Sequence, residues 1–338
     1  MDNSNQETYL GDKIDKSGKI KPTIDARVSK GYGAVSNILA IVNEVPLGHW
    51  RVEAGLHLRQ AMLLNGTLFN LEAWQGVTDH EIEQIEKVDE ALLRGLLNAH
   101  SKVPLEALFL ETGCIPIRYT VKSRRLNYLH NILQKDPEEI VREVYEAQKT
   151  DPSDGDFIDL VAKDKVLIKL NMTDEEICRV TKEQFKVMVK SKINSAAMDY
   201  LKEKQQNHSK VRNIEYSKFE TAEYLRSPLF NSQSIELLFS LRTRTVRGIR
   251  KDFQGMYTDH SCPLACGDDD TLTNVLACSV LQSHVQNNTV ASEFIKYEDI
   301  FSNDVRKQRQ VTELYSQLLT IREQLLDSSP VTETGPVH

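Results

Sequence analysis

The chain has 338 residues, of which 40% are hydrophobic and 27% are charged, so it can form two or three domains, or one large domain, with a real core. Fifteen glycines and ten prolines are few for this length and argue against a barrel or sandwich with many tight turns. The net charge of −7 argues against a uniformly basic nucleic-acid binder, although local patches decide binding more than the total does.

The first predicted element is a short β-hairpin. In TYLGDKIDKSGKIK, residues 8–21, an apolar pair and a glycine precede a polar KSGK stretch, which indicates a strand and a turn. Residues 24–42 then place apolar side chains at helical spacing, interrupted by Gly31 and Gly33. Because GYGAVS lacks the third glycine of a nucleotide-binding loop, we interpret these glycines as a helix bend or a close contact between helices.

The rest of the chain is predicted to be mainly helical. Thr78 and Glu81 have the spacing of a capping box, Gly113 ends a short helix, and Pro116 and Pro137 lie at the starts of two more. The predicted helices lie at residues 50–66, 77–100, 103–113, 114–133, 136–150, within 151–164, twice within 173–207, and at 232–241 and 306–326. We therefore expect a mainly α fold with a short N-terminal β-hairpin and a small C-terminal cysteine knuckle.

No familiar catalytic motif is present. The sequence contains no Walker A loop, nucleophile elbow, H-E-x-x-H pair or dinucleotide fingerprint. Residues 151–160, DPSDGDFIDL, do not align with a calcium loop and are interpreted as the capped start of a helix. Asp268, Asp269 and Asp270 are consecutive, which is more typical of a solvated turn than of a two-metal site. The residue types alone therefore indicate no active site.

The predicted helix at 114–133 carries a basic face. Arg118, Lys122 and Arg125 are spaced by four and three residues and therefore share one side of the helix. This side either presents a cationic ridge to phosphates or is a solvated surface paired with acids in residues 136–146. The sequence favours neither alternative.

A second basic segment precedes the cysteines. Residues 242–251 contain five basic side chains and no acid, and arginine suits bidentate phosphate contacts. A cationic segment leading into a metal knuckle is a common way to hold single-stranded nucleic acid, and the alternative is a helix surface packed on the acidic C-terminal tail. The basic residues are Arg242, Arg244, Arg247, Arg250 and Lys251.

A short segment gathers three of the five cysteines with C-x3-C-x11-C spacing: Cys262, Cys266 and Cys278. Zinc prefers four nitrogen or sulfur ligands, and the position that would complete a C-x3-C-x7-H-x3-C knuckle is Asn274, whose amide is a poor zinc ligand. Three thiolates could still bind zinc with His260, His284 or water as the fourth ligand. The alternative is that the cysteines are simply buried without metal.

The cysteine count and the apolar runs indicate a compartment. An odd number of cysteines without disulfide-like spacing is typical of a reducing environment. The polar, acidic N-terminus does not resemble a signal peptide, and no apolar run approaches the length of about 18 residues typical of a transmembrane helix. We therefore expect an intracellular protein, in the nucleus or cytoplasm, without a membrane partner.

Five segments that follow one another along the chain span about residues 8–320: YLGDKID…GKI…ARVSKGYG, RQAMLLNGTLFNLEAW, HSKVPLEALFLETGCIPIRYTVKSRRLNYLHNIL, LRTRTVRGIRKDF and the cysteine cluster. Together they resemble the region downstream of the catalytic palm in non-LTR (LINE-like) retrotransposon reverse transcriptases. The resemblance implies a helical thumb at 22–110. It also implies residues near the primer grip (Tyr9, Leu10, Gly11), basic contacts (Arg124, Arg125, Arg242, Arg244) and three knuckle ligands (Cys262, Cys266, Cys278), with Asn274 in place of a histidine.

Two departures from the family limit the implied activity. The aspartate pair of the Y-x-D-D motif, which holds the two catalytic metal ions, is missing, and so is an endonuclease domain. We therefore expect a truncated, non-enzymatic fragment that retains RNA or single-stranded DNA binding and a zinc site. The alternative is a host-adopted α-helical scaffold for protein interactions. The expected divisions are 1–20 (end of palm), 21–150 (thumb and connector), 151–255 (helical region with basic segment), 256–285 (knuckle) and 286–338 (helix and disordered tail).

Overall fold

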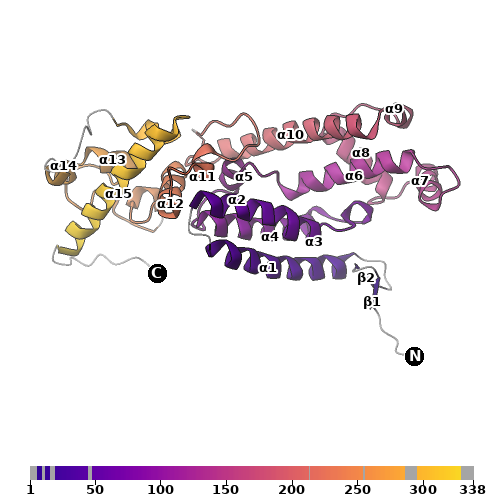
Figure 1. Ribbon diagram of the computed structural model, residues 1–338, viewed down its shortest axis with the longest axis horizontal. Helices are drawn as coiled ribbons and strands as arrows, with labels where there is room; N and C mark the ends of the chain where they lie inside the picture. The colour runs from indigo at the N-terminus through magenta and orange to yellow at the C-terminus, as the bar shows by residue number, and fades with distance from the viewer. Residues whose placement is uncertain are drawn as a thin grey trace.

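The structure, a computed structural model, describes residues 6–9, 12–15, 20–44, 48–212, 214–253, 256–285 and 295–328. It confirms a mainly α fold. Helices α1, α4, α6 and α10 run along the long axis, and α12–α15 gather at the end where the chain finishes (Figure 1). Among these described ranges, no helix combines the length and apolar character needed to cross a membrane.

The predicted fold class is corrected at one point, because the N-terminal β-hairpin is not a separate component of the architecture. Strands β1 (Gln6–Tyr9) and β2 (Asp12–Asp15) pair antiparallel over four residues each, and among the described residues no further strand joins them. The segment is held to α1 by Thr23, whose Oγ1 lies 2.9 Å from both the backbone N and O of Lys13. A two-stranded ribbon of this length is marginal alone, so the architecture of the described residues is helical. The expected turn at 16–19 lies outside the described residues.

Helix α1 (Lys21–Asn43) continues through both glycines without a break. A Cβ at Gly31 would lie 2.8 Å from Val88 Cγ1 and 2.9 Å from Thr67 Cγ2. Non-bonded carbon atoms essentially never come this close, so only glycine allows α1 to approach α4 to this distance. This confirms the interpretation of Gly31 as a close contact between helices.

The predicted helix at 50–66 is present but changes type along its length. It consists of α2 (Gly48–Leu58), a π-helical stretch η1 (Arg59–Leu64) and α3 (Asn65–Thr67). At the start of the π-helical stretch, Arg59 donates two bonds of 2.6 Å to the buried carboxylate of Asp89 in α4. The spacing of apolar residues in the sequence does not predict a π-helix. Such stretches are rare and often occur where a particular side chain must be positioned, as Arg59 is here.

The remaining helices include the predicted ones, in the predicted order, and several short ones that the sequence did not predict. They are η2 (Leu71–Ala73), α4 (Asp79–Leu97), α5 (Leu105–Thr112), α6 (Ile117–Leu133), α7 (Ile140–Thr150), α8 (Phe157–Leu167), α9 (Asp174–Arg179), α10 (Lys182–Gln206), α11 (Glu223–Arg226), α12 (Ser232–Arg242), η3 (Arg250–Phe253), α13 (Leu272–Ala277), α14 (Ser279–Val285), η5 (Tyr297–Phe301) and α15 (Val305–Ser328). The capping box of Thr78 with Glu81 is confirmed, and Gly113 ends α5 with a φ of 70°. Helix α7 begins later than expected, so Pro137 lies in the preceding turn.

Buried apolar side chains gather in separate clusters along the molecule. One cluster lies between α1 and α4 around Ile38 and Leu92, and another joins α6, α8 and α10 around Phe185. The largest joins α5 to α12 and α15 around Phe239 and Tyr315. The second cluster contains residues on both sides of position 150, where the sequence predicted a boundary between two regions. The expected domain divisions remain a prediction.

Candidate metal centre and cationic cleft

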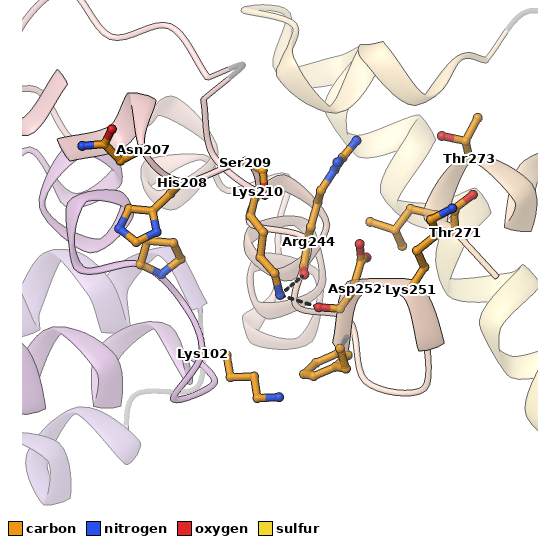
Figure 2. A pocket seen from close by; sticks show the side chains of 13 residues that line it. Lys102, Asn207, His208, Ser209, Lys210, Arg244, Lys251, Asp252, Thr271 and Thr273 are labelled. Atoms are coloured by element: carbon orange, nitrogen blue, oxygen red, sulfur yellow. Dashed lines mark hydrogen bonds between the residues drawn. The ribbon is translucent and has the colours of Figure 1, made fainter. Parts of the chain in front are cut away.

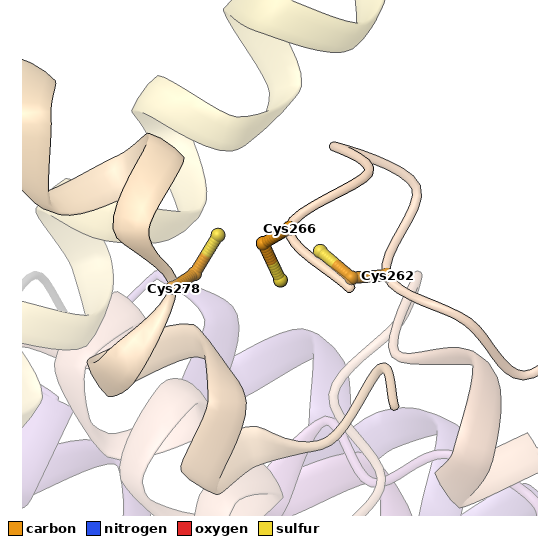
Figure 3. A group of neighbouring side chains, drawn as sticks. All are labelled: Cys262, Cys266 and Cys278. Carbon is orange, nitrogen blue, oxygen red and sulfur yellow. The ribbon is translucent and has the colours of Figure 1, made fainter. Parts of the chain in front are cut away.

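The three clustered cysteines come together in space. The Sγ atoms of Cys262, Cys266 and Cys278 all lie within 4.8 Å of one another. Cys262 and Cys266 lie on a tight loop, and Cys278 lies between α13 and α14 (Figure 3). This arrangement could hold a metal ion, as their spacing in the sequence indicates.

The loop geometry explains how two of the thiols meet. The backbone N–H of Cys262 donates to Asp268 O at 2.8 Å, and Ser261 and Asp269 form an isolated β-bridge. Between them the backbone turns back through positive φ angles at Ala265 (57°) and Gly267 (95°). Because the loop closes on itself, residues four apart in the sequence face the same point.

The position predicted for a fourth ligand is occupied by an amide. Asn274 Nδ2 lies 3.5 Å from Cys266 Sγ, and Asn274 Oδ1 lies 3.7 Å from the same sulfur. His260 and His284 are not members of the group of close ligand atoms. The ring of His284 instead contacts the carbonyl of Val280 in its own helix, with Nδ1 at 2.8 Å. The described residues therefore supply three sulfur donors and a neighbouring amide.

The environment of the thiols differs from one cysteine to the next. A hydrogen bond from the backbone of Asp268, with smaller contributions from Asn274 and the other thiols, lowers the pKa of Cys266. Burial raises the pKa of Cys262 to about 11. Three sulfur atoms at this separation suit a thiophilic ion such as zinc, which binds thiolates and would displace the thiol protons.

The acidic run beside the cysteines is the solvated turn expected from the sequence only in part, because Asp268 and Asp269 are exposed whereas Asp270 is buried. Asp270 is 1% exposed, and its Oδ2 accepts bonds from Arg322 Nη2 at 2.7 Å and from the backbone N of Arg250 at 2.8 Å. In addition, Tyr315 Oη donates to Leu272 O at 2.9 Å. Asp270 and Tyr315 therefore anchor the cysteine segment to α15 and to the basic run.

The basic face of α6 is used for contacts between helices. Arg118 forms an ion pair with Glu86 of α4 at 2.5 Å, and Lys122 and Arg125 both bind Asp164 of α8, at 3.2 and 2.8 Å. The acids expected as partners, in residues 136–146, are therefore not the ones used. Arg124 donates to Leu68 O at 2.8 Å.

The basic run at 242–251 is divided between the core and the surface. Arg242 is 6% exposed and forms an ion pair with the fully buried Glu111 at 2.7 Å. Arg250 pairs with Asp259 at 3.1 Å, and Lys251 pairs with Asp269. Arg244 donates to Tyr297 Oη at 3.2 Å, whereas the side chain of Arg247 is exposed. The run is therefore not one continuous cationic surface.

Two members of this run meet other cations at a cleft of about 720 Å³. The cleft lies between the segment after α10, the basic run and residues 271–273 of the cysteine segment. Figure 2 shows its side chains arising from these separate stretches of chain. We refer to it as the cationic cleft, after its four basic lining residues: Lys102, Lys210, Arg244 and Lys251.

A buried aromatic ring organises one side of the cationic cleft. The Nζ atoms of Lys102 and Lys210 lie 5.2 and 5.1 Å from the ring centre of Phe253. Lys210 Nζ also donates to Asp252 O at 2.5 Å and to Arg244 O at 3.3 Å. Burial, together with the charges of Lys102 and Arg244, lowers the pKa of Lys210.

One carboxylate faces this group of cations. Asp252 Oδ2 is buried and has no hydrogen-bond partner, although Arg244 and Lys210 are nearby charges. Burial raises the pKa of Asp252 to about 6. The lining of the cleft therefore has four basic side chains and one acid, Asp252, while Lys251 also pairs with Asp269 outside the lining.

Lys102 and Lys210 are functional candidates that the sequence reasoning missed. Neither lies in a basic run, so charge clustering does not find them. Both occur in the tetrapeptide HSKV, at residues 100–103 and again at 208–211, and both copies reach the cationic cleft. The repeated tetrapeptide is a sequence feature that the two lysines share, but it points to the cleft only together with the fold. Of the primer-grip residues, Tyr9 lies in β1, whereas Leu10 and Gly11 lie outside the described residues.

No protein-family model, curated protein or solved structure matches the chain. The geometry of the cysteine group and the cationic cleft, together with the sequence motifs, is therefore the basis for assigning a function.

Proposed function

We propose that this chain is a helical nucleic-acid-binding module that corresponds to the region downstream of the palm in LINE-like reverse transcriptases. The observation that carries the proposal is the convergence of basic side chains from three separate segments, Lys102, Lys210 and the pair Arg244 and Lys251, on one cleft. Cations brought together from distant parts of a chain with a net charge of −7 favour an anionic ligand.

The cationic cleft suits the backbone of a single strand. Proteins that bind single strands without strong sequence preference use a positively charged groove that follows the phosphates. Lys251 already pairs with the exposed Asp269, and a phosphate would compete with that carboxylate. Not every member of the basic run can contact phosphates in this way, because Arg242 forms an ion pair with Glu111 in the core.

We also propose that Cys262, Cys266 and Cys278 hold zinc. Bound there, the ion would supply a structural link between the cysteine loop and the C-terminal end of α13, the helix whose first residues line the cationic cleft. Asn274, or water, would stand at the fourth position. Loss of the ion would loosen residues 271–273, which line the cleft.

The proposal includes an absence of polymerase activity in the chain alone. Two-metal nucleotide transfer needs carboxylates brought together at one site, and the sequence contains no Y-x-D-D pair. Primer extension by the purified chain at the level of its buffer control is the expected result. Extension above that level would contradict this part of the proposal.

Retention of single-stranded RNA tests the binding function. We expect the purified chain to retain a labelled oligonucleotide at low salt and to release it as salt rises, because phosphate contacts displace counterions. A chain that retains no RNA at low salt, but forms a protein complex insensitive to salt, would contradict the proposal and favour an interaction scaffold.

A further inference from the structure

A second cavity lies near the start of α10, between that helix, α6 and the short helix η2. Its volume is about 300 Å³, and its lining includes Glu72, Arg124, Tyr128, His130, Lys182 and Lys186. The cationic cleft is at the opposite end of α10, where Asn207 lines it. At about 1.5 Å per residue, the helix separates Lys186 from Asn207 by about 30 Å, so the two sites are distinct.

A buried histidine with an unused acceptor forms part of this second cavity. His130 is 3% exposed, its ring stacks on Phe185 at 5.1 Å, and its Nε2 lies 2.9 Å from Val180 O. A carbonyl oxygen only accepts, so Nε2 carries the proton and the neutral ring has its lone pair on Nδ1. That Nδ1 is buried and has no hydrogen-bond partner.

A second acceptor lies in the same lining. Glu72 Oε2 is also buried without a hydrogen-bond partner. A buried polar atom without a partner is unfavourable, and protein structures rarely retain one without a reason. Two such atoms in one cavity indicate a ligand that donates N–H or O–H groups to them.

The rim of the cavity is cationic. Lys182 and Lys186 are one helical turn apart, are exposed, and have no ion-pair partner among the residues that the structure describes. Arg124 Nη1 donates to Leu68 O at 2.8 Å, which holds its guanidinium at the cavity. Three cations against the carboxylate of Glu72 favour an anion at the rim, and a phosphate group can accept from all three.

We propose that this cavity binds one nucleotide. Its phosphate contacts Lys182, Lys186 and Arg124, while hydroxyl or amino groups of its sugar or base donate to His130 Nδ1 and Glu72 Oε2. The volume of about 300 Å³ is at the small end of ligand cavities and suits a single nucleotide rather than a strand. The nucleotide is either a free nucleoside monophosphate or the 5′-phosphorylated end of a strand. The proposal does not depend on strand binding at the cationic cleft, because the two sites share no residue.

Calorimetric titration of the full chain with AMP, at low salt and up to about 1 mM, tests the first source. We expect Lys182→Ala combined with Lys186→Ala to weaken AMP binding at least tenfold. Lys190→Ala, which removes an exposed charge from the same helix outside the cavity, should leave the affinity unchanged. Inorganic phosphate should bind more weakly than AMP, because it lacks the sugar and base donors.

A matched pair of short oligonucleotides, one with a 5′-phosphate and one with a 5′-hydroxyl, tests the second source. Tighter binding of the phosphorylated strand that disappears in the double lysine variant assigns the site to strand ends. AMP binding without that difference assigns it to free nucleotides. The proposal is overturned if neither AMP nor the 5′-phosphate depends on the two lysines, or if inorganic phosphate binds as tightly as AMP. A double variant of the cationic cleft, Lys102→Ala with Lys251→Ala, should retain AMP binding even if it loses RNA, which separates this site from the proposed strand-binding function.

Discussion

The side-chain amide of Asn274 lies 3.5 Å from Cys266 Sγ, at the place where a fourth metal ligand would complete the three-cysteine group. An amide nitrogen is not a zinc ligand, whereas an imidazole is. We therefore expect Asn274→His to raise zinc affinity by about tenfold or more, where each factor of ten equals about 1.4 kcal/mol. Competition against a chromophoric chelator measures the change.

Two cysteine variants provide a matched pair for the same zinc measurement. Cys262→Ser removes one of three sulfur donors and should abolish the single equivalent of zinc expected in the purified wild-type chain. Cys178→Ser, which changes an exposed cysteine outside the group, should retain it. Absence of zinc in the wild type, together with no gain in Asn274→His, would show that the cysteines are structural only.

The pairing of Arg242 with Glu111 predicts a loss of stability on mutation. The two residues are 131 positions apart, and both are buried. Arg242→Met leaves the carboxylate of Glu111 without its cation, which should lower the free energy of unfolding by about 3–5 kcal/mol. Arg309→Ala, in an exposed pair with Glu313, should change it by less than about 0.5 kcal/mol. Urea denaturation measures both variants, and an unaltered Arg242→Met protein would contradict a structural role.

The raised pKa of Asp252 predicts a pH dependence of RNA binding. Its carboxyl titrates at about 6, above the ordinary value of 3.8, so lowering the pH from 7 to 5.5 neutralises the one acid that faces Arg244 and Lys210. We expect RNA binding to tighten over this interval. In Asp252→Asn the neutral state is permanent, so binding at pH 7 should be at least as tight as in the wild type and should vary less with pH. Because His100 and His208 lie at or near the cleft in both proteins, the difference between the two proteins is the informative quantity.

The same raised pKa of Asp252 predicts how the stability of the protein changes with pH. The native state binds the Asp252 proton more tightly than the unfolded state, so this group favours folding below about pH 4 and loses that contribution as the pH rises through about 6. Asp252→Asn should therefore be more stable relative to the wild type at pH 7 than at pH 4.5. Equal differences at the two pH values would contradict the raised pKa.

Local signals in the sequence were sufficient for most of the helices. The capping box of Thr78 and Glu81 and the left-handed glycine at Gly113 act within one turn of chain, so their residue types predict the helix ends directly. The cysteine spacing likewise predicted the group of three thiols, because a tight loop joins two of them. The hairpin was wrong as a part of the fold class, because its two strands of four residues pair only with each other and the described residues are otherwise helical.

Interactions between distant residues could not be predicted in this way. A run of basic residues does not reveal which of them will meet an acid, and Arg118, Arg125 and Arg242 pair with Glu86, Asp164 and Glu111 on other helices. Lys102 and Lys210 lie 108 positions apart and meet only because α10 returns to the start of α5. Their shared HSKV tetrapeptide identifies them only once the fold places both copies at one cleft.

Salt-dependent binding of single-stranded RNA to the wild-type chain and to Lys102→Ala combined with Lys251→Ala tests the central claim most directly. Fluorescence anisotropy over about 50–300 mM salt should give a linear fall of log affinity with log salt, with a slope of about 0.7 per phosphate contact. The double variant should bind more weakly and have a slope smaller by about 1.4, whereas Arg309→Ala should match the wild type. No RNA binding at 50 mM salt, or an identical slope in the double variant, would contradict the assignment of the cationic cleft as a nucleic-acid site.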